Sequence, residues 1–128
     1  MIHLFVFQVN DVNFALPVEE VISVQNENDF DTIDYKLSIA NIRNEIYAVI
    51  DLGQYFYGEK VKGHNYLLVK DDKENKLALK VDEILGIIDV KEETKIKVSP
   101  ILKHSHILYH IRYDNKLINV VKIEIEDV

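Results

Sequence analysis

The stretch SIANIRNEIYAVIDL, residues 38–52, decides the fold of this chain. Two short apolar runs flank residues 43–45, and Asn44 tolerates the positive φ of a tight reversal, so a β-hairpin is predicted. The second arm ends at Asp51, whose side chain is expected to cap a short helix. Gln54 is the expected reciprocal partner of a capping box. The stretch therefore predicts strand, turn, strand and capped helix.

The composition is that of one ordinary globular domain. The chain has 128 residues, of which 48% are hydrophobic and 29% charged, and it contains no cysteine. The absence of cysteine excludes disulfides and thiolate catalysis and fits a reducing compartment. The N-terminal run has no basic region and is broken at His3 and Gln8, so neither a signal peptide nor a membrane span is expected. A cytoplasmic location is the default expectation.

The charge pattern argues against nucleic-acid binding. The formal net charge is −7 and the calculated pI about 5.2. A nucleic-acid binder needs clustered Lys and Arg, whereas the lysines here alternate with acids and Arg43 and Arg112 are the only arginines. We expect a solvated surface and no nucleic-acid partner.

The rest of the chain alternates short apolar segments with turn residues. A short helix of about two turns is predicted after Pro17, with Val18, Val21 and Ile22 on one face. Residues 25–36 are expected to form an exposed connection. Gly86 is a plausible β-bulge. The predicted strands cover residues 2–9, 14–16, 66–69, 77–81, 84–90, 107–111 and 121–125. Many short strands with little helix predict an all-β barrel class.

The hairpin segment resembles the CheW-like domain family of bacterial chemotaxis, whose pattern is roughly G-V-x-N-L-R-G-x-V-x-P-V-[IV]-D-L. Residues 5–24 resemble the family's opening strands and short helix, and residues 77–100 its V-D-x-[IV]-x-x-[IV] strand pair. The likeness runs in one register from about residue 2 to residue 125. Glycine is favoured in the family at the positions of Ser38 and Asn44. The hairpin residues that fit the pattern are Asn41, Ile42, Arg43, Val49, Ile50, Asp51 and Leu52.

The resemblance implies one domain, residues 1–128, of two small five-stranded SH3-like barrels around a shared core. It further implies a non-catalytic adaptor that couples chemoreceptor tips to the regulatory domain of a CheA-type histidine kinase, without a cofactor. The departures from the family pattern leave an alternative, a diverged interaction module with a different signalling partner. Ser23, for example, stands where the family frequently has glutamate, and Ala48 where it has proline.

The candidate receptor-binding residues follow from the same resemblance. Val21 matches a valine at the edge of the family's receptor groove, and Ile22 and Val24 continue its apolar stripe. Arg43 matches an arginine near the receptor surface, and its guanidinium could bind a carboxylate or carbonyl of a partner. Asn41 belongs to the same motif and is also suited to holding the hairpin backbone.

A cluster of histidines gives the one alternative of another class. His104, His106 and His110 have even spacings and would share a strand face, which suggests a metal-dependent enzyme. Strand neighbours at i and i+2 are roughly 6 to 7 Å apart at the backbone, and no further ligand is predicted. The polar-strand interpretation is preferred, and no metal is expected.

Overall fold

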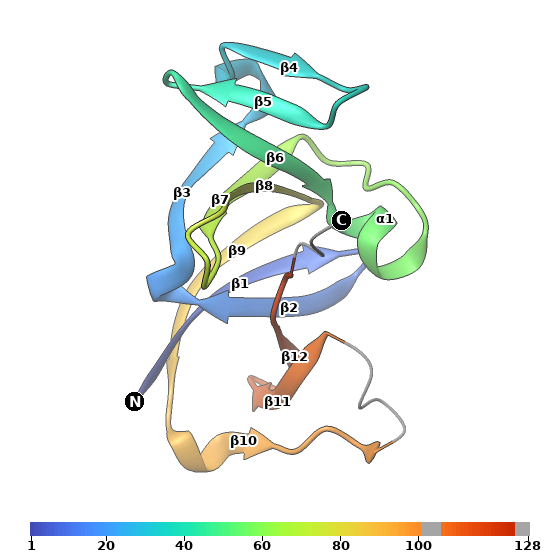
Figure 1. The fold of residues 1–128 in the computed structure, drawn as a ribbon. Coiled ribbons are helices and arrows are strands. Elements are labelled where there is room, and N and C mark those ends of the chain that lie inside the picture. The colour runs from blue at the N-terminus through green and yellow to red at the C-terminus, as the bar shows by residue number, and fades with distance from the viewer. Residues whose placement is uncertain (101–105, 125–128) are drawn as a thin grey trace.

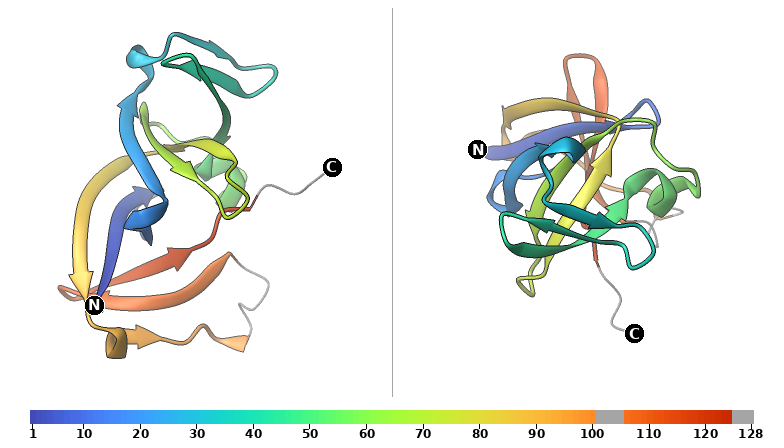
Figure 2. Two further views of the ribbon diagram at one scale, coloured as in Figure 1. Left: turned by 60° about the vertical axis from the view of Figure 1, so that its left-hand side comes forward. Right: turned by 90° about the horizontal axis from the view of Figure 1, so that it is seen from above.

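The computed structural model describes residues 1–100 and 106–124, and it consists of two curved antiparallel-rich sheets (Figure 1). The first sheet has the strand order β10-β11-β12-β2-β1-β9, and the second has the order β3-β7-β8-β6-β5-β4. The views in Figure 2 show each sheet curling into a small barrel, one above the other.

The elements are short, as the sequence predicted. The strands of the first sheet are β1 (Ile2–Val9), β2 (Val12–Pro17), β9 (Glu83–Val90), β10 (Lys95–Ile96), β11 (Ile107–Tyr113) and β12 (Lys116–Val121). Those of the second are β3 (Val21–Asn26), β4 (Thr32–Asp34), β5 (Ile39–Ile42), β6 (Glu45–Asp51), β7 (Asn65–Lys70) and β8 (Lys76–Val81). The helical elements are α1 (Leu52–Tyr57) and the 3-10 turns η1 (Val18–Glu20), η2 (Glu27–Asp29) and η3 (Glu92–Thr94).

The predicted central hairpin is confirmed as β5 and β6. Ile42 pairs with Glu45, and the two residues between them, Arg43 and Asn44, have φ of 53° and 64°. Positive φ at both central positions is the type I′ geometry that matches the twist of the flanking strands. The hairpin therefore closes with a two-residue turn.

The capping geometry follows the hairpin. The Asp51 carboxylate accepts a hydrogen bond from the backbone N–H of Gln54 at 3.1 Å, and α1 ends at Gly58, whose φ is 74°. Within residues 1–100 and 106–124, the Gln54 side chain makes no return bond to the Asp51 backbone, so the capping box is half complete. In this same part of the chain no helix is long and apolar enough to cross a membrane.

The bulge expected at Gly86 is also confirmed. Gly86 has a φ of 112°, and the β1–β9 register shifts between Val6 and Phe7, so that Leu85 is the extra residue. Glycine suits this position because side chains disfavour that backbone conformation.

The predicted helix after Pro17 is wrong beyond its first turn. Only the three residues of η1 are helical, and Val21 and Ile22 belong to strand β3. The β3–β7 register shifts between Val21 and Ser23, so Ile22 lies in a bulge. The bulge places Val21 and Val24 on one face although they are three residues apart, which imitates helical periodicity. The expected exposed connection over 25–36 is likewise interrupted by η2 and β4.

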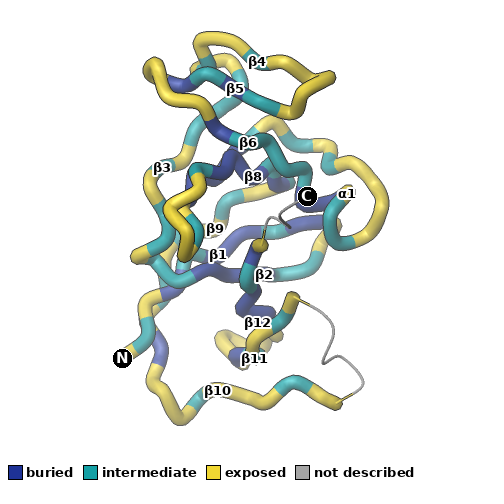
Figure 3. The backbone as a smooth tube through the Cα atoms, viewed as in Figure 1, coloured by how far each residue is buried: buried dark blue, intermediate teal, exposed yellow. Residues whose placement is uncertain are grey.

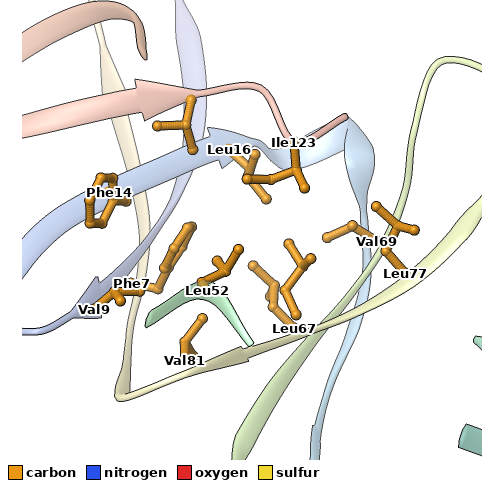
Figure 4. Packing of buried hydrophobic residues seen from close by; sticks show 12 residues of the cluster. Phe7, Val9, Phe14, Leu16, Leu52, Leu67, Val69, Leu77, Val81 and Ile123 are labelled. Atoms are coloured by element: carbon orange, nitrogen blue, oxygen red, sulfur yellow. The ribbon is translucent and has the colours of Figure 1, made fainter. Parts of the chain in front are cut away.

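A shared core joins the two barrels. Its buried side chains come from both sheets, as Figure 4 shows for Phe7 and Phe14 of the first sheet and Leu67 and Val81 of the second. In Figure 3 the buried stretches of backbone gather where the barrels meet. Two smaller clusters fill the individual barrels, around Leu4 and Ile111 in the first and Tyr66 in the second.

The all-β fold of two small barrels is thus confirmed, with one correction. Each sheet has six strands rather than five. The additional members are very short, three residues in β4 and two in β10. Strands of that length leave little hydrophobic periodicity for a sequence to show.

Candidate functional site

One face of the second sheet packs against the first barrel and extends beyond the area that this barrel covers. Leu67 of β7 and Leu77 and Leu79 of β8 lie at the middle of this face and are fully buried in the shared core. The face continues sideways onto β3 at one edge and onto β6 and β5 at the other, where apolar side chains become solvent-exposed. We name the first edge the β3 margin, formed by Val21, Ile22 and Val24.

The β3 margin brings three of the predicted receptor-binding residues together. Val21 pairs with Val69 and Val24 with Leu67, so both valines lie on the shared-core face, because directly opposed residues share a face. Val21 is half-buried and packs against the core. Ile22 is 48% exposed and Val24 42%. The margin is thus anchored in the core at Val21 and open to solvent beyond it.

The first barrel contributes a neighbouring apolar strip that the sequence did not indicate. Phe5 packs against the same shared core as Val21, and its cross-strand partner on β9 is Ile87, which is 59% exposed. Leu85, at the bulge, is 48% exposed. In Figure 1 and in the left view of Figure 2, β9 runs down from the level of β3 on the same side of the molecule. Alternation along β9 marked these residues as strand but could not show that their outer face is uncovered.

A polar pair closes the lower end of this strip. His3 and Asp89 are opposite each other on β1 and β9, with Nδ1 and Oδ1 2.5 Å apart and both side chains more than half exposed. They lie on the same face as Phe5 and Ile87. The apolar strip therefore ends in an acid and a base that are already paired.

Arg43 does not belong to the β3 margin and comes later in the sequence. It is exposed in the β5–β6 turn, and among the described residues no acid lies within ion-pair distance of its guanidinium. The neighbouring Asn44 donates its backbone N–H to the Asp31 carboxylate at 3.3 Å. Because Asp31 follows η2, the turn lies beside the end of the β3–η2 segment, as Figure 1 also shows.

Asn41 is placed in the hairpin and away from the β3 margin. Its backbone carbonyl accepts the N–H of Asp31 at 2.9 Å. Its side-chain Oδ1 is buried and has no hydrogen-bond partner within the described part of the chain. Unpaired buried carbonyl groups are uncommon, and each one needs a physical account.

A carboxylate network fixes the segment that follows β3. Glu27 accepts hydrogen bonds from the hydroxyls of Tyr35 and Tyr66, the latter at 3.3 Å, and lies 3.4 Å from His64 Nδ1. The Tyr35 hydrogen bond in particular lowers the pKa of Glu27, and burial raises the pKa of Tyr66. This network ties η2 to the β4–β5 turn and to β7, so it holds the far end of β3 in place.

The two described histidines of the cluster, His106 and His110, have separate partners and do not form a metal site together. His106 contacts the Tyr55 hydroxyl at 3.1 Å, whereas His110 Nδ1 lies 2.7 Å from the side chain of Asn119. A register shift between Ile107 and Tyr109 also breaks the alternation on which a shared face depended. His104 lies outside the described residues. In residues 1–100 and 106–124, no group of three or more His, Asp or Glu side chains could hold a metal ion.

The exposed side chains of the β3 margin and of the strip on β9 offer a partner apolar contact. The fold is an all-β pair of SH3-like barrels, and known proteins with a similar sequence or structure have the same fold. The model of the CheW-like domain family matches residues 3–124, so the chain belongs to that family. A search of curated proteins finds no match.

A solved structure supports the fold independently. The crystal structure of the scaffolding protein TtCheW from Thermoanaerobacter tengcongensis superposes with a TM-score of 0.81. The two chains are 22% identical, and the match covers 95% of this chain and 89% of that one. At this identity the likeness concerns the fold.

Proposed function

We propose that this protein is a non-catalytic chemotaxis adaptor in the cytoplasm, which binds the helical tip of a chemoreceptor and the regulatory domain of a CheA-type histidine kinase. Membership of the CheW-like family over residues 3–124 carries the proposal. The receptor surface is the β3 margin together with the strip of Phe5, Leu85 and Ile87.

The shape and chemistry of the β3 margin suit a helical partner. An amphipathic helix binds by placing side chains at i, i+3, i+4 and i+7 on an apolar surface. Ile22, Val24 and Ile87 are between 42% and 59% exposed, so they can lose water-accessible area on docking. Exposed apolar patches of this kind commonly mark interaction sites.

Arg43 is proposed as the polar contact next to this surface. Its guanidinium is exposed and not committed to an acid of the described chain, so it is available to a carboxylate or helix C-terminal carbonyl of the receptor. Asn41, by contrast, is proposed to act through the hairpin backbone and to position the turn that carries Arg43.

The adaptor would act by fixing geometry. A receptor signal changes kinase activity through a scaffold only if the contacts differ in free energy between two arrangements of the assembly. Two barrels joined by one buried core transmit such a difference well because the shared core resists relative movement of the barrels.

The direct test is a calorimetric titration of the protein with a receptor-tip hairpin fragment and, separately, with the kinase regulatory domain. We expect both to bind. Ile22→Asp or Val24→Asp should weaken receptor binding at least tenfold and leave kinase binding within twofold, because a charge would be buried at the apolar contact. Arg43→Ala should weaken receptor binding about two- to fivefold, the typical cost of one exposed charged contact.

Leu117→Asp is the matched control. Leu117 is 52% exposed on β12, on the outer face of the first barrel, so the substitution replaces an exposed apolar side chain by the same charged one but is remote from the β3 margin. Receptor binding should be unchanged in this variant. If the wild-type protein binds neither fragment at high micromolar concentration, the adaptor assignment is wrong; if it binds another signalling protein instead, the diverged-module alternative holds.

A further inference from the structure

The β5–β6 hairpin is apolar on both of its faces. Its inner face fills the second barrel with Ala40, Ile42 and Tyr47, which are 1%, 2% and 3% exposed. The outer side chains would be polar in a hairpin that faced water, because antiparallel sheets with one solvated face alternate apolar and polar residues. Here, apart from Asn41, they are apolar instead. We name this surface the β5–β6 margin, formed by Leu37, Ile39, Ile46, Ala48 and Ile50.

This margin is the opposite edge of the shared-core face. Ala48 pairs with Leu77 and Ile50 with Leu79, and both pack against the shared core. The face then continues onto Ile39, the cross-strand partner of Ala48. The first barrel covers β8 but not the hairpin beyond it. The apolar face that the first barrel covers at β8 is therefore exposed to solvent at the β5–β6 hairpin.

The outer residues of the β5–β6 margin are largely exposed to solvent. Ile46 is 59% exposed and Leu37 68%. Beside them the surface is hollowed into a cavity of about 520 Å³, bounded on the far side by Tyr55 of α1 and by His106. Asn41 lies on the same face opposite Ile46. The surface thus has an apolar floor and a concave side.

The charges around the margin favour a second copy of this chain as the occupant. The protein as a whole has a net charge of −7, so two copies repel unless they meet where acids and bases balance. The hairpin side of the margin carries one acid and one base at its two ends. Asp34 is opposite Ile39 on β4, at one end of the face, and Arg43 occupies the hairpin turn at the other end. Both side chains are exposed.

We propose that two copies of the protein associate through their β5–β6 margins about a two-fold axis. A two-fold contact is isologous, so the same patch meets itself with its ends exchanged. Exchange of the ends brings Arg43 of each copy toward Asp34 of the other, while Ile46, Ile39 and Ala48 lose water at the centre.

The dimer is expected to be weak. A stable interface generally buries about 800 Å² on each partner, and the margin is a few side chains on one hairpin. A dissociation constant on the order of 1 to 100 µM is expected for a contact of this size. The association would leave Val21, Ile22 and Val24 free, because β7, β8 and β6 lie between β3 and β5 in the strand order, but it would engage Arg43, the proposed polar receptor contact.

Sedimentation velocity across a concentration series from about 1 to 500 µM tests the proposal, since that range brackets the expected dissociation constant. The wild-type protein should shift from monomer to dimer. Ile46→Lys should weaken association at least tenfold, as should Leu37→Ser. Leu117→Lys is the matched control for Ile46→Lys, because Leu117 has a similar exposure of 52% on the other barrel. Circular dichroism melting establishes that each variant remains folded.

Charge reversal tests the orientation of the two copies. Asp34→Arg and Arg43→Asp should each weaken association, and the double variant should restore it, because both intermolecular pairs are then reversed together. Failure of the double variant to recover overturns the two-fold arrangement. A wild-type protein that stays monomeric throughout the series, or an Ile46→Lys variant that dimerises normally, overturns the proposal. Loss of kinase-domain or receptor binding in Ile46→Lys, without any change in self-association, would assign this margin to that partner instead.

Discussion

The carboxylate of Asp51 accepts a hydrogen bond from the backbone N–H of Val61, at 3.2 Å and ten residues further along the chain. The same carboxylate caps α1 through the N–H of Gln54. One side chain therefore holds both the start of the helix and the loop that returns from it. The loop passes so close to Gly53 that a Cβ there would lie 2.3 Å from the carbonyl oxygen of Glu59.

Asp51→Ala should therefore destabilise the protein by about 2 kcal/mol, because it removes a helix cap and leaves a second backbone donor unpaired. Asp51→Asn should cost about half as much, because the amide oxygen still accepts one hydrogen bond. Urea unfolding at pH 7 measures both. Glu93→Ala is the control, since Glu93 is exposed on η3. A cost for Asp51→Ala no larger than that of the control would contradict the double role.

The cap was open to prediction because its partners are close in sequence. Asp51 and Gln54 are three residues apart, and the hairpin before them depends on a turn of two residues. Local geometry of this kind is encoded by the residue types themselves. The Val61 hydrogen bond belongs to a loop without periodicity, and nothing in the sequence indicated it.

Strand β3 shows why other parts of the fold were not predictable. Its pairing partner, Val69 for Val21, is distant in the chain, and the bulge at Ile22 gives the segment a helix-like spacing. Tertiary pairing overrides such local signals. The parallel contacts of β6 with β8 and of β12 with β2 are likewise invisible to periodicity.

The candidate site was predictable only in part. Val21, Ile22 and Val24 are adjacent in sequence, so they were bound to lie near one another in space. That Ile22 and Val24 are exposed depends on how far the first barrel covers the second sheet, which is a property of tertiary packing. The contribution of Ile87 depends on the same coverage at β9.

The lowered pKa of Glu27 predicts that the protein loses stability at acidic pH. The hydrogen bond from Tyr35 lowers this pKa below the ordinary value of 4.5. A carboxyl group with a lowered pKa contributes stability that is present above about pH 4.5 and is lost as the pH falls through the folded-state value. Glu27→Gln should therefore reduce the unfolding free energy by about 1 kcal/mol at pH 7, a modest amount because the network is partly solvated.

The difference between Glu27→Gln and wild type should shrink toward zero as the pH falls from about 5 to 3. Urea unfolding at several pH values, with Glu93→Gln as the matched control, gives the comparison. A difference that stays constant over this range would show that the lowered pKa of Glu27 has no part in stability.

Ser38 and Asn44 have backbone conformations that suit glycine. Their φ angles are 54° and 64°, and the CheW-like pattern favours glycine at both positions. A left-handed conformation costs an ordinary side chain about 1 kcal/mol, and asparagine less. Ser38→Gly should stabilise the protein by about 0.5 kcal/mol once the greater freedom of the unfolded chain is included, and Asn44→Gly should be close to neutral.

Ser23→Gly is the control for this pair. Ser23 lies within strand β3 and its φ is not positive, so glycine there should destabilise by about 0.5 to 1 kcal/mol. Thermal melting under identical conditions ranks the three variants. A destabilised Ser38→Gly would mean that the serine side chain, and not its φ, determines stability at that position.

Asn119 reinforces the short pairing between strands β12 and β2 of the first barrel. Strands β12 and β2 are parallel and pair at only two positions, Asn119 with Phe14 and Val120 with Ala15. The Asn119 side chain, 8% exposed, reinforces this seam by donating to the backbone carbonyl of Asn13 at 3.0 Å, while its Oδ1 contacts His110.

Asn119→Ala should therefore cost about 2 kcal/mol, because it leaves a nearly buried carbonyl without its donor and removes a contact between two strands that have few. Leu117→Ala, on the same strand but 52% exposed, should cost less than about 0.5 kcal/mol and serves as the control. Amide hydrogen exchange should show the loss first in β12, since its protection depends on the seam. Equal protection of β12 in the wild type and in Asn119→Ala would show that backbone pairing alone holds the seam.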